Sequence, residues 1–280
     1  MPSPVDECGL DVPWCLSRAV ERSSFYLTPT VQFPTGAKLR GERRDMLLDW
    51  AAEHGGPIIE NDHDAHFRFD GQTPRRPLKA DGRSASVVYI SSFNRTLFPS
   101  LRLAFLVASP PLRERLLRRY EDTVSAGCLP NQIVPREFID EGGYSAHLRR
   151  LQSLLRERRD ALLAILRPYL GTVLNPPVNR GSLHLVLNPV HENADHLVRR
   201  LRAVGIASVS LRDLAIRARV PNALLLGFAG FPEAAIEAAA PALRATLDPI
   251  VSRTVGNRQV ASLATSGLLA GAAARPSFEG

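Results

Sequence analysis

The sequence predicts an α/β fold, in which a mostly parallel sheet with covering helices is followed by a small α+β domain. Short apolar runs rich in β-branched residues, at 57–59 and 87–90, each lead into a polar cluster. This pattern is typical of buried strands that carry chemistry at their carboxyl ends. Amphipathic runs over 40–52 and 110–127 predict helices that can cover such a sheet.

Composition and charge restrict the class of protein. With 280 residues, of which 45% are hydrophobic and 22% charged, the chain can bury one large core or two smaller ones. The net charge of +7 comes from arginines scattered along amphipathic helices, which indicates solvated helix faces more than a nucleic-acid patch. Three cysteines lack finger or disulfide spacing, and no signal-peptide or membrane-spanning run occurs, so we expect a cytoplasmic protein without membrane contact.

The family resemblance described below implies that the chain divides into four regions. They are a large domain (1–130), a helical crossing (131–168), a small C-terminal domain (169–250) and a flexible tail rich in Ala, Gly and Ser (251–280).

The first elements of the large domain alternate between strand and helix. The segment 24–28 reads as a strand, and a turn rich in Pro and Gly follows it. The run 40–52 is expected to be a covering helix. Ile58 and Ile59 then form a buried strand that delivers the polar residues 60–64 to its carboxyl end, and the polar segment 70–86 is a loop.

The segment 87–108 is the centre of the predicted site. It reads as an apolar strand over 87–90, a Ser-rich turn, a polar tip at 94–96 and a second apolar strand over 101–108. A turn after a buried strand is where α/β folds place chemistry.

The C-terminal half is predicted from its periodicity. Apolar residues recur at helical spacing through 131–168, and His147 is expected on the polar side with no particular role. The small domain is predicted to contain strands over 183–187, 207–211 and 223–230 and helices over 195–205 and 232–247.

Several of these segments resemble the aminotransferase-like half of MocR/GntR-type transcriptional regulators, which have the fold of type I pyridoxal-phosphate (PLP) enzymes. Residues 91–107 read SSFNRTLFPSLRLAFLV, and the family pattern is close to GTFSKTLFPGLRLGYLV. Residues 57–71 read PIIENDHDAHFRFDG, similar to IIEDDYDSEFRYDG, and residues 28–36 read TPTVQFPTG, similar to TPSHQFPTG. The resemblance covers roughly residues 1–250 and implies part of a fold-type-I large domain followed by the small domain.

The resemblance also implies which part of the family architecture is present. The chain begins within the family's large domain, so an N-terminally truncated form is expected, without the winged helix and the phosphate-binding glycine turn. No DNA-reading motif is visible.

The resemblance implies a degenerate PLP site. Arg95 stands where the family has the lysine that forms the imine with PLP. An imine needs a primary amine that can lose its proton, whereas a guanidinium stays protonated, so no Schiff base is expected at this position. The chain contains only two lysines, Lys38 and Lys79, and neither lies in this motif.

Other positions of the site follow from the same resemblance. Asn61 stands where an aspartate pairs with the pyridine nitrogen, and His63 where a tyrosine meets the ring oxygen. A neutral amide supports a protonated pyridine far less well than a carboxylate does. Ser92, Asn94 and Arg102 match positions around the PLP phosphate, although Arg102 could also be a strand-end arginine that faces solvent.

The polar cluster NDHDAH at 61–66 admits other interpretations when it is taken by itself. Asp62, His63, Asp64 and His66 offer oxygen and nitrogen ligands for a metal. However, adjacent residues of a strand point to opposite faces and rarely converge on one ion. A decayed PLP motif and simple surface polarity are therefore the two other interpretations.

We expect a protein that does not form a Schiff base and acts as an effector-sensing, scaffolding or vestigial domain. The alternative is a functional PLP-dependent aminotransferase-like enzyme that holds PLP noncovalently or is completed by a partner chain. A third hypothesis, which rests on arginine content, is a module that binds nucleic acid or an anionic metabolite. The expected partners are a second copy of the chain, a companion chain that supplies the missing N-terminal half, and a small amino-acid-like or phosphate ligand.

Overall fold

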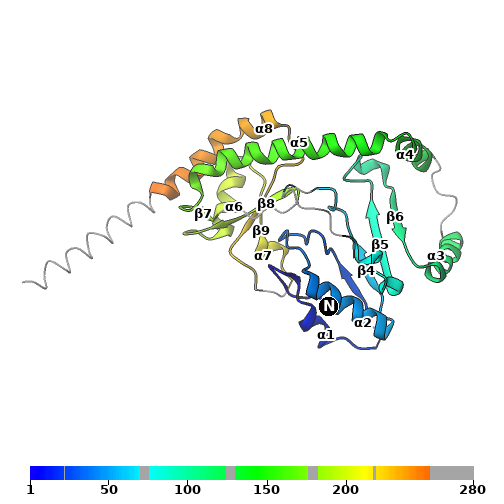
Figure 1. The fold of residues 1–280 in the computed structure, drawn as a ribbon. Coiled ribbons are helices and arrows are strands. Elements are labelled where there is room, and N and C mark those ends of the chain that lie inside the picture. Colours follow the sequence, from blue (N-terminus) through cyan, green and yellow to red (C-terminus); the bar gives the residue numbers. More distant parts are fainter. Residues whose placement is uncertain are drawn as a thin grey trace, which may run out of the picture.

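Two four-stranded sheets lie toward opposite ends of the long helix α5 (Gly143–Leu166), as Figure 1 shows. This computed structural model describes residues 1–21, 23–67, 69, 76–123, 130–175, 182–216 and 219–252. The predicted tail at 251–280 therefore lies almost entirely outside the described residues. None of the helices in the described ranges is both long and apolar enough to cross a membrane.

The larger sheet is mostly parallel and has the order β3-β4-β5-β6. Its first three strands run parallel, and β6 is antiparallel to β5. The strands are β3 (Phe25–Leu27), β4 (Ile58–Asn61), β5 (Val87–Ser92) and β6 (Ala104–Val107). The second apolar strand, predicted over 101–108, is thus shorter, because a 3-10 turn, η3 (Pro99–Leu101), precedes it.

Helix α2 (Gly41–His54) and the N-terminal elements share one apolar core with this sheet. The N-terminal elements are β1 (Val5–Asp6), β2 (Gly9–Leu10) and α1 (Val12–Leu16). Leu47 and Leu48 of α2 pack in one cluster with Ile58 and Val87 of the sheet. The polar loop predicted over 70–86 contains two 3-10 turns, η1 (Leu78–Ala80) and η2 (Ser84–Ser86), and its residues 70–75 lie outside the described part.

The smaller sheet is antiparallel, with the order β7-β8-β10-β9. Its strands are β7 (Leu174–Asn175), β8 (His184–Pro189), β9 (Val209–Ser210) and β10 (Leu224–Gly227). Leu185, Leu187, Leu224 and Leu226 alternate along β8 and β10 and are buried in the main core of this half. That core also includes residues of α5, α6 (Ala194–Ala203) and α8 (Glu233–Ala238).

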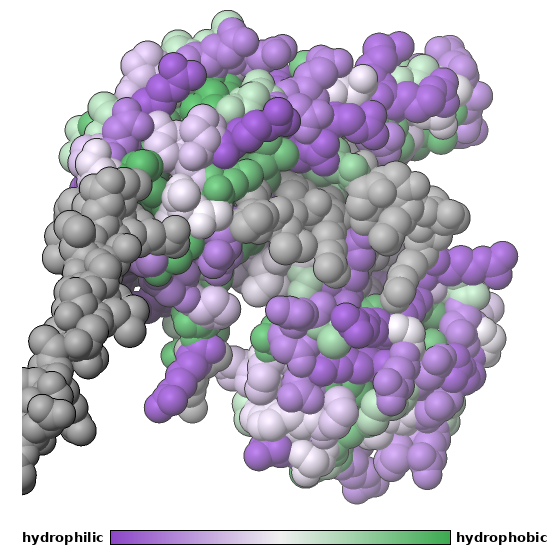
Figure 2. All heavy atoms as spheres, turned by 60° about the vertical axis from the view of Figure 1, so that its left-hand side comes forward, coloured by the Kyte–Doolittle hydropathy of each residue, from purple (hydrophilic) through white to green (hydrophobic). Residues whose placement is uncertain are grey.

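Two further features of the C-terminal half differ from the predicted pattern. The helix predicted over 232–247 is divided near Ala239 into α8 and a second helical stretch over 240–252. A short helix, α7 (Leu211–Leu214), follows β9 where the prediction had only strand. Figure 2 shows hydrophilic side chains over the outside of the arm that contains α5, with hydrophobic ones gathered beneath it.

The outer edge of the larger sheet is apolar and exposed. All four residues of β6 are exposed, and no described strand pairs with its outer side. Helices α3 (Pro110–Thr123), α4 (Pro130–Asp140) and this strand together expose large apolar side chains: Phe105, Leu106, Val107, Leu117, Tyr120, Ile133 and Val134. These exposed apolar residues are together called the β6 surface.

Candidate functional site

The candidate site lies at the carboxyl edge of the parallel strands β3, β4 and β5. Asn61 is the last residue of β4, and Ser92 is the last residue of β5. Because parallel neighbours end at the same edge of a sheet, the segments that follow these strands come together there. The structure thus brings Asn61, His63, Ser92 and Arg95 to one edge, as the sequence predicts.

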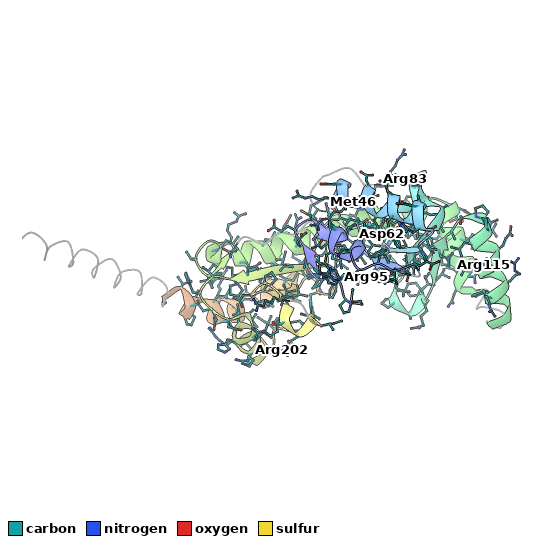
Figure 3. The ribbon with its side chains drawn as sticks, turned by 90° about the horizontal axis from the view of Figure 1, so that it is seen from below. Met46, Asp62, Arg83, Arg95, Arg115 and Arg202 are labelled. Atoms are coloured by element: carbon teal, nitrogen blue, oxygen red, sulfur yellow. The ribbon has the colours of Figure 1, made fainter. Side chains whose placement is uncertain are left out.

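Arg95 forms an ion pair with Asp64 at this edge. Its Nη1 lies 2.5 Å from Asp64 Oδ1, and the guanidinium side chain is 44% exposed. Figure 3 labels Arg95 and Asp62 in the half of the protein that contains the larger sheet. A guanidinium thus occupies the position of the family lysine and is paired with a carboxylate.

The first turn of α5 holds the tip that carries Arg95. Thr96, which is buried, accepts a hydrogen bond from the Tyr144 hydroxyl at 3.0 Å. The ring nitrogen Nε2 of His147 lies 2.6 Å from the Thr96 carbonyl oxygen, to which it donates. The expectation that His147 has no particular role is therefore wrong, because a residue on the polar side of a helix still contacts a loop that folds back onto it.

Asn61 and His63 have different environments. The Asn61 amide Nδ2 donates to the Tyr26 hydroxyl, whereas its Oδ1 is buried without a partner. His63 Nδ1 lies 3.5 Å from Ser92 Oγ. Burial lowers the pKa of His63, and the positive charge of Arg95 lowers it further, while Asp64 acts in the opposite direction. These effects favour the neutral form of the imidazole.

Three buried oxygen atoms without partners follow the three parallel strands in turn. They are Thr28 Oγ1 after β3, Asn61 Oδ1 at the end of β4 and Asn94 Oδ1 after β5. Nearly all buried polar atoms in proteins have a hydrogen-bond partner, so three exceptions along one edge indicate a site for a ligand or for ordered water. An oxygen acceptor suits the N–H or O–H groups of such a ligand.

The small sheet reaches this site through His184 on β8. His184 Nε2 donates to the carbonyl oxygen of Pro34 at 2.9 Å, and the ring lies edge-on to Phe33 with centroids 5.6 Å apart. Burial lowers the pKa of His184, and Asp64 and Arg95 both lie close enough to influence it. Sequence reasoning thus missed the contact of His184 with the loop after β3.

Arg102 lies at the surface. It ends η3 in the left-handed region, with φ of 50°, and its guanidinium has no partner among the described residues. Left-handed backbone is uncommon for a residue other than glycine and is often found at functional positions. The structure thus leaves Arg102 free to meet a ligand or to face solvent.

Sequence reasoning missed Tyr26, Thr28, Phe33 and Tyr144 as members of the site. Thr28 and Phe33 lie in the segment 28–36, whose likeness to the family was the only signal that could have identified them. No sequence pattern could have identified Tyr144, because it contacts Thr96 only in the tertiary structure. In the described part of the chain, no group of three or more His, Cys, Asp or Glu side chains is placed to hold a metal.

Comparisons with known proteins agree with this geometry. No family model matches the chain. However, it is 30% identical over 233 residues to the "Uncharacterized HTH-type transcriptional regulator YhdI" of Bacillus subtilis (strain 168), which covers 81% of this chain and 48% of that protein. It is also 30% identical over 233 residues to the "Probable rhizopine catabolism regulatory protein MocR" of Rhizobium meliloti, which covers 82% of this chain and 46% of that protein.

Solved structures show the same fold. LysN, the α-aminoadipate aminotransferase of Thermus thermophilus, superposes with a TM-score of 0.74 at 26% identity, over 90% of this chain and 66% of that one. The chain is a class I/II aminotransferase domain of PLP fold type I, homologous to MocR/GntR-type HTH regulators. This aminotransferase-like domain spans about half the length of the curated relatives that it matches. The kynurenine aminotransferase of Pyrococcus horikoshii, solved with PMP, superposes with a TM-score of 0.73 at 22% identity, over 89% of this chain and 63% of that one.

The residues of the aminotransferase-like domain do not fit a covalently held PLP. The side chain at position 95 is a guanidinium paired with Asp64. The Nζ atom of Lys79 donates to the Ser84 carbonyl oxygen at 3.0 Å, beside η1, on a loop that does not contribute to the site. The three buried oxygens fit a ligand that donates hydrogen bonds, and the partly exposed Arg95 guanidinium fits a negative charge.

Proposed function

We propose that this aminotransferase-like domain binds a small anionic ligand without forming a Schiff base, and that it works as an effector-sensing domain. The observation that carries the proposal is the ion pair between Arg95 and Asp64 at the position of the family lysine. The ligand class that suits the site is an amino acid or a phosphorylated amine, since such a molecule carries both hydrogen-bond donors and a negative charge.

The chemistry of residue 95 supports a non-catalytic role. A lysine at this position would supply the amine for the imine and would move the proton at the substrate carbon. A guanidinium paired with a carboxylate does neither, but it can exchange that carboxylate for the carboxylate or phosphate of a ligand. Asp64 and the ligand then compete for Arg95, so ligand binding would change the contacts of the segment 94–96.

The unpartnered oxygens favour sensing over a purely structural role. A buried polar atom costs about 1–3 kcal/mol when neither protein, water nor ligand bonds to it, and three oxygens along this edge have no protein partner. A ligand that donates hydrogen bonds to these atoms would remove this cost, and binding would then stabilise the fold.

The test is to add PLP to the purified chain, reduce with borohydride and measure the intact mass. The wild-type chain is expected to show no adduct that exceeds the background from surface amines. Arg95→Lys, alone or together with Asn61→Asp, is expected to gain one adduct at position 95. Arg113→Lys on the exposed face of α3 is the matched control for an added surface lysine.

A specific, reduction-stable adduct on the wild-type chain would contradict the proposal. PLP that binds reversibly, and leaves on dialysis without any adduct, is consistent with a noncovalent site. In that case, release of an amino group from an added amino acid would favour the alternative of a working aminotransferase-like enzyme. Binding without turnover supports a sensor.

The β6 surface supports a second expectation, a homodimer or a complex with a companion chain. An apolar strand with an unpaired outer edge is a template for pairing with another chain. Sedimentation velocity on the purified chain tests this expectation. A monomer that stays monodisperse at high concentration would contradict the homodimer.

A further inference from the structure

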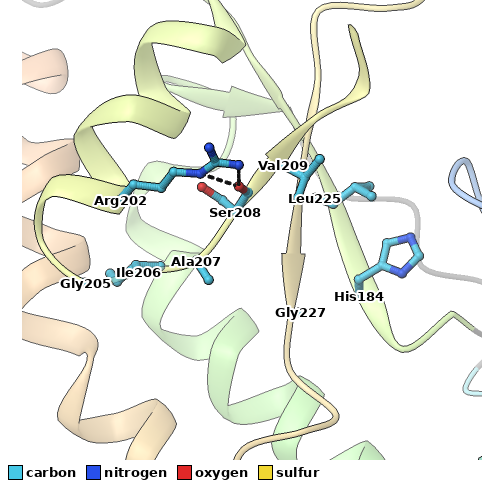
Figure 4. Close-up of a pocket in the computed structure, with 9 residues that line it drawn as sticks. All are labelled: His184, Arg202, Gly205, Ile206, Ala207, Ser208, Val209, Leu225 and Gly227. Carbon is cyan, nitrogen blue, oxygen red and sulfur yellow. Dashed lines mark hydrogen bonds between the residues drawn. The ribbon is translucent and has the colours of Figure 1, made fainter. Parts of the chain in front are cut away.

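A cavity of about 540 Å³, apart from the site at Arg95, opens on the face of the small sheet opposite to its main core. Leu225 of β10 and Val209 of β9 are directly paired and form its apolar wall together with Ile206 (Figure 4). The side chains of Leu224 and Leu226 alternate with Leu225 and point into the main core instead. The cavity is therefore separate from the packed interior of this half.

A guanidinium is fixed at the edge of this cavity. Arg202, in the last turn of α6, donates from Nε and Nη2 to the carbonyl oxygen of Ser208, at 3.0 and 2.8 Å (Figure 4). Both bonds go to one backbone oxygen, so the positive charge of Arg202 is oriented but not neutralised. Across the described part of the chain, no carboxylate is paired with Arg202.

Ser208 supplies a second polar group. Its residue is only 4% exposed, and its Oγ is buried without a hydrogen-bond partner. Ser208 also lines the cavity, and a ligand that reached its Oγ would give this hydroxyl the partner that it lacks.

We propose that this cavity binds a small carboxylate with an apolar body. Arg202 and the Ser208 hydroxyl would meet the carboxylate, and Ile206, Val209 and Leu225 would contact the apolar part. A guanidinium and a hydroxyl at the mouth of an apolar pocket form the usual arrangement for such a ligand, in which a few polar groups orient the molecule.

The cavity has lining residues of its own, which include neither Arg95 nor the residues of the three unpartnered oxygens. Figure 3 shows Arg202 in the small C-terminal half, well apart from Arg95. The two sites are nevertheless adjacent through His184, which lines this cavity and donates to Pro34 in the loop after β3. A ligand here would therefore border the contact between the two halves of the protein.

The experiment is isothermal titration calorimetry of the full chain with acetate, butyrate and hexanoate, and with inorganic phosphate as the competing anion. Affinity is expected to rise from acetate to hexanoate, by up to about fourfold for each buried methylene group. Arg202→Gln is expected to weaken hexanoate binding by about tenfold or more, and Ser208→Ala by about threefold or more.

Matched variants separate the cavity from general effects of charge and folding. Arg199→Gln removes one exposed arginine from the same helix outside the cavity and is expected to leave hexanoate binding unchanged. Arg95→Gln is expected to change the affinity for hexanoate by less than about twofold. A result that contradicts the cavity proposal can therefore be told apart from one that contradicts the proposed function of the Arg95 site. If Arg202→Gln does not fold, Arg202→Lys takes its place, since it keeps the charge but loses the forked donor pair and should weaken hexanoate binding by about threefold or more.

Three results would overturn the proposal. They are an absence of hexanoate binding to the wild-type chain, binding that the folded Arg202 and Ser208 variants leave unchanged, and a preference for phosphate over hexanoate. Thermal unfolding of each variant shows whether it is folded at the temperature of the titration.

Discussion

The carboxyl edge of the larger sheet and the core face of the smaller sheet bury different kinds of residue. At the carboxyl edge of the larger sheet, Glu60, Asn61, Asp62, Ser91 and Thr96 are all buried. In the smaller sheet, the buried positions of β8 and β10 that face the main core are leucines. Burying polar groups destabilises a fold unless each has a partner, whereas burying leucine stabilises it.

This difference separates the part of the chain that mainly stabilises the fold from the part that carries the candidate site. The smaller sheet is built as an ordinary apolar core between α5, α6 and α8. The larger sheet retains buried polar atoms, three of them without partners, at an edge where the family places its cofactor. Substitutions that exchange polar for apolar groups should therefore have opposite effects in the two sheets.

The largest expected effect is in the smaller sheet. Leu185 of β8 is fully buried. Leu185→Ala is expected to lower the free energy of unfolding by about 2–5 kcal/mol, because it removes buried apolar atoms and leaves a cavity. Urea denaturation measures this change, and Leu214→Ala on the partly exposed α7 is the control, expected within about 0.5 kcal/mol of wild type.

Glu60 should be the most sensitive polar position in the larger sheet. Its carboxylate accepts from the backbone N–H groups of Leu78 and Lys79, at 2.8 and 2.9 Å. Glu60→Ala leaves both donors unpaired and is expected to lower the free energy of unfolding by about 2–4 kcal/mol in urea denaturation. A change below about 0.5 kcal/mol would contradict the role given to this carboxylate.

The pH dependence of Glu60 gives an independent check. Burial raises the pKa of Glu60 above its usual 4.5, which outweighs the two backbone N–H groups that lower it. The folded state then holds a proton that the unfolded state has lost, so the wild type should lose stability relative to Glu60→Gln as the pH rises through and above 4.5. The opposite slope between the two proteins would show that the carboxylate is better stabilised when folded.

Thr28→Val tests whether an unpartnered oxygen lowers the free energy of unfolding of the ligand-free protein. Removing Thr28 Oγ1 with little change of shape is expected to raise the free energy of unfolding by about 1–2 kcal/mol. Thr246→Val is the matched control, since its buried Oγ1 donates to the Ala242 carbonyl oxygen at 2.9 Å, and its loss should destabilise. If both variants lower the free energy of unfolding, Thr28 Oγ1 already has a hydrogen-bond partner in solution.

The smallest effect on stability is expected at Arg95. The Arg95–Asp64 pair is partly exposed, so Arg95→Gln should change the free energy of unfolding by less than about 1 kcal/mol. The same variant should raise the pKa of His63, because burial and then the charge of Arg95 lower it in the wild type. Nuclear magnetic resonance titration of the imidazole protons measures this shift, with Arg113→Gln as the control, and an unchanged pKa would place Arg95 away from His63 in solution.

Particular elements show how far the sequence could go. The β-branched run at 87–90 and the Ser-rich turn after it identified β5 and the tip that carries Arg95, because strand periodicity and turn chemistry are local properties. The exposure of β6 could not be predicted in the same way, since an apolar strand reads alike whether or not a neighbour covers it. The division of the last helix near Ala239, by contrast, lies two residues before Pro241, and a proline inside a predicted helix is a local signal that could have indicated the division.

The sequence by itself determined that an arginine replaces the amine of the family, that the pyridine-pairing carboxylate is an amide, and that these residues follow neighbouring strands. Only the tertiary structure decided that Arg95 pairs with Asp64, that Tyr144 and His147 hold Thr96 from the start of α5, and that oxygens at three strand ends stay without partners. The physical reason is that composition and periodicity act over a few residues, whereas ion pairs and buried hydrogen bonds depend on distances between segments that lie far apart along the chain.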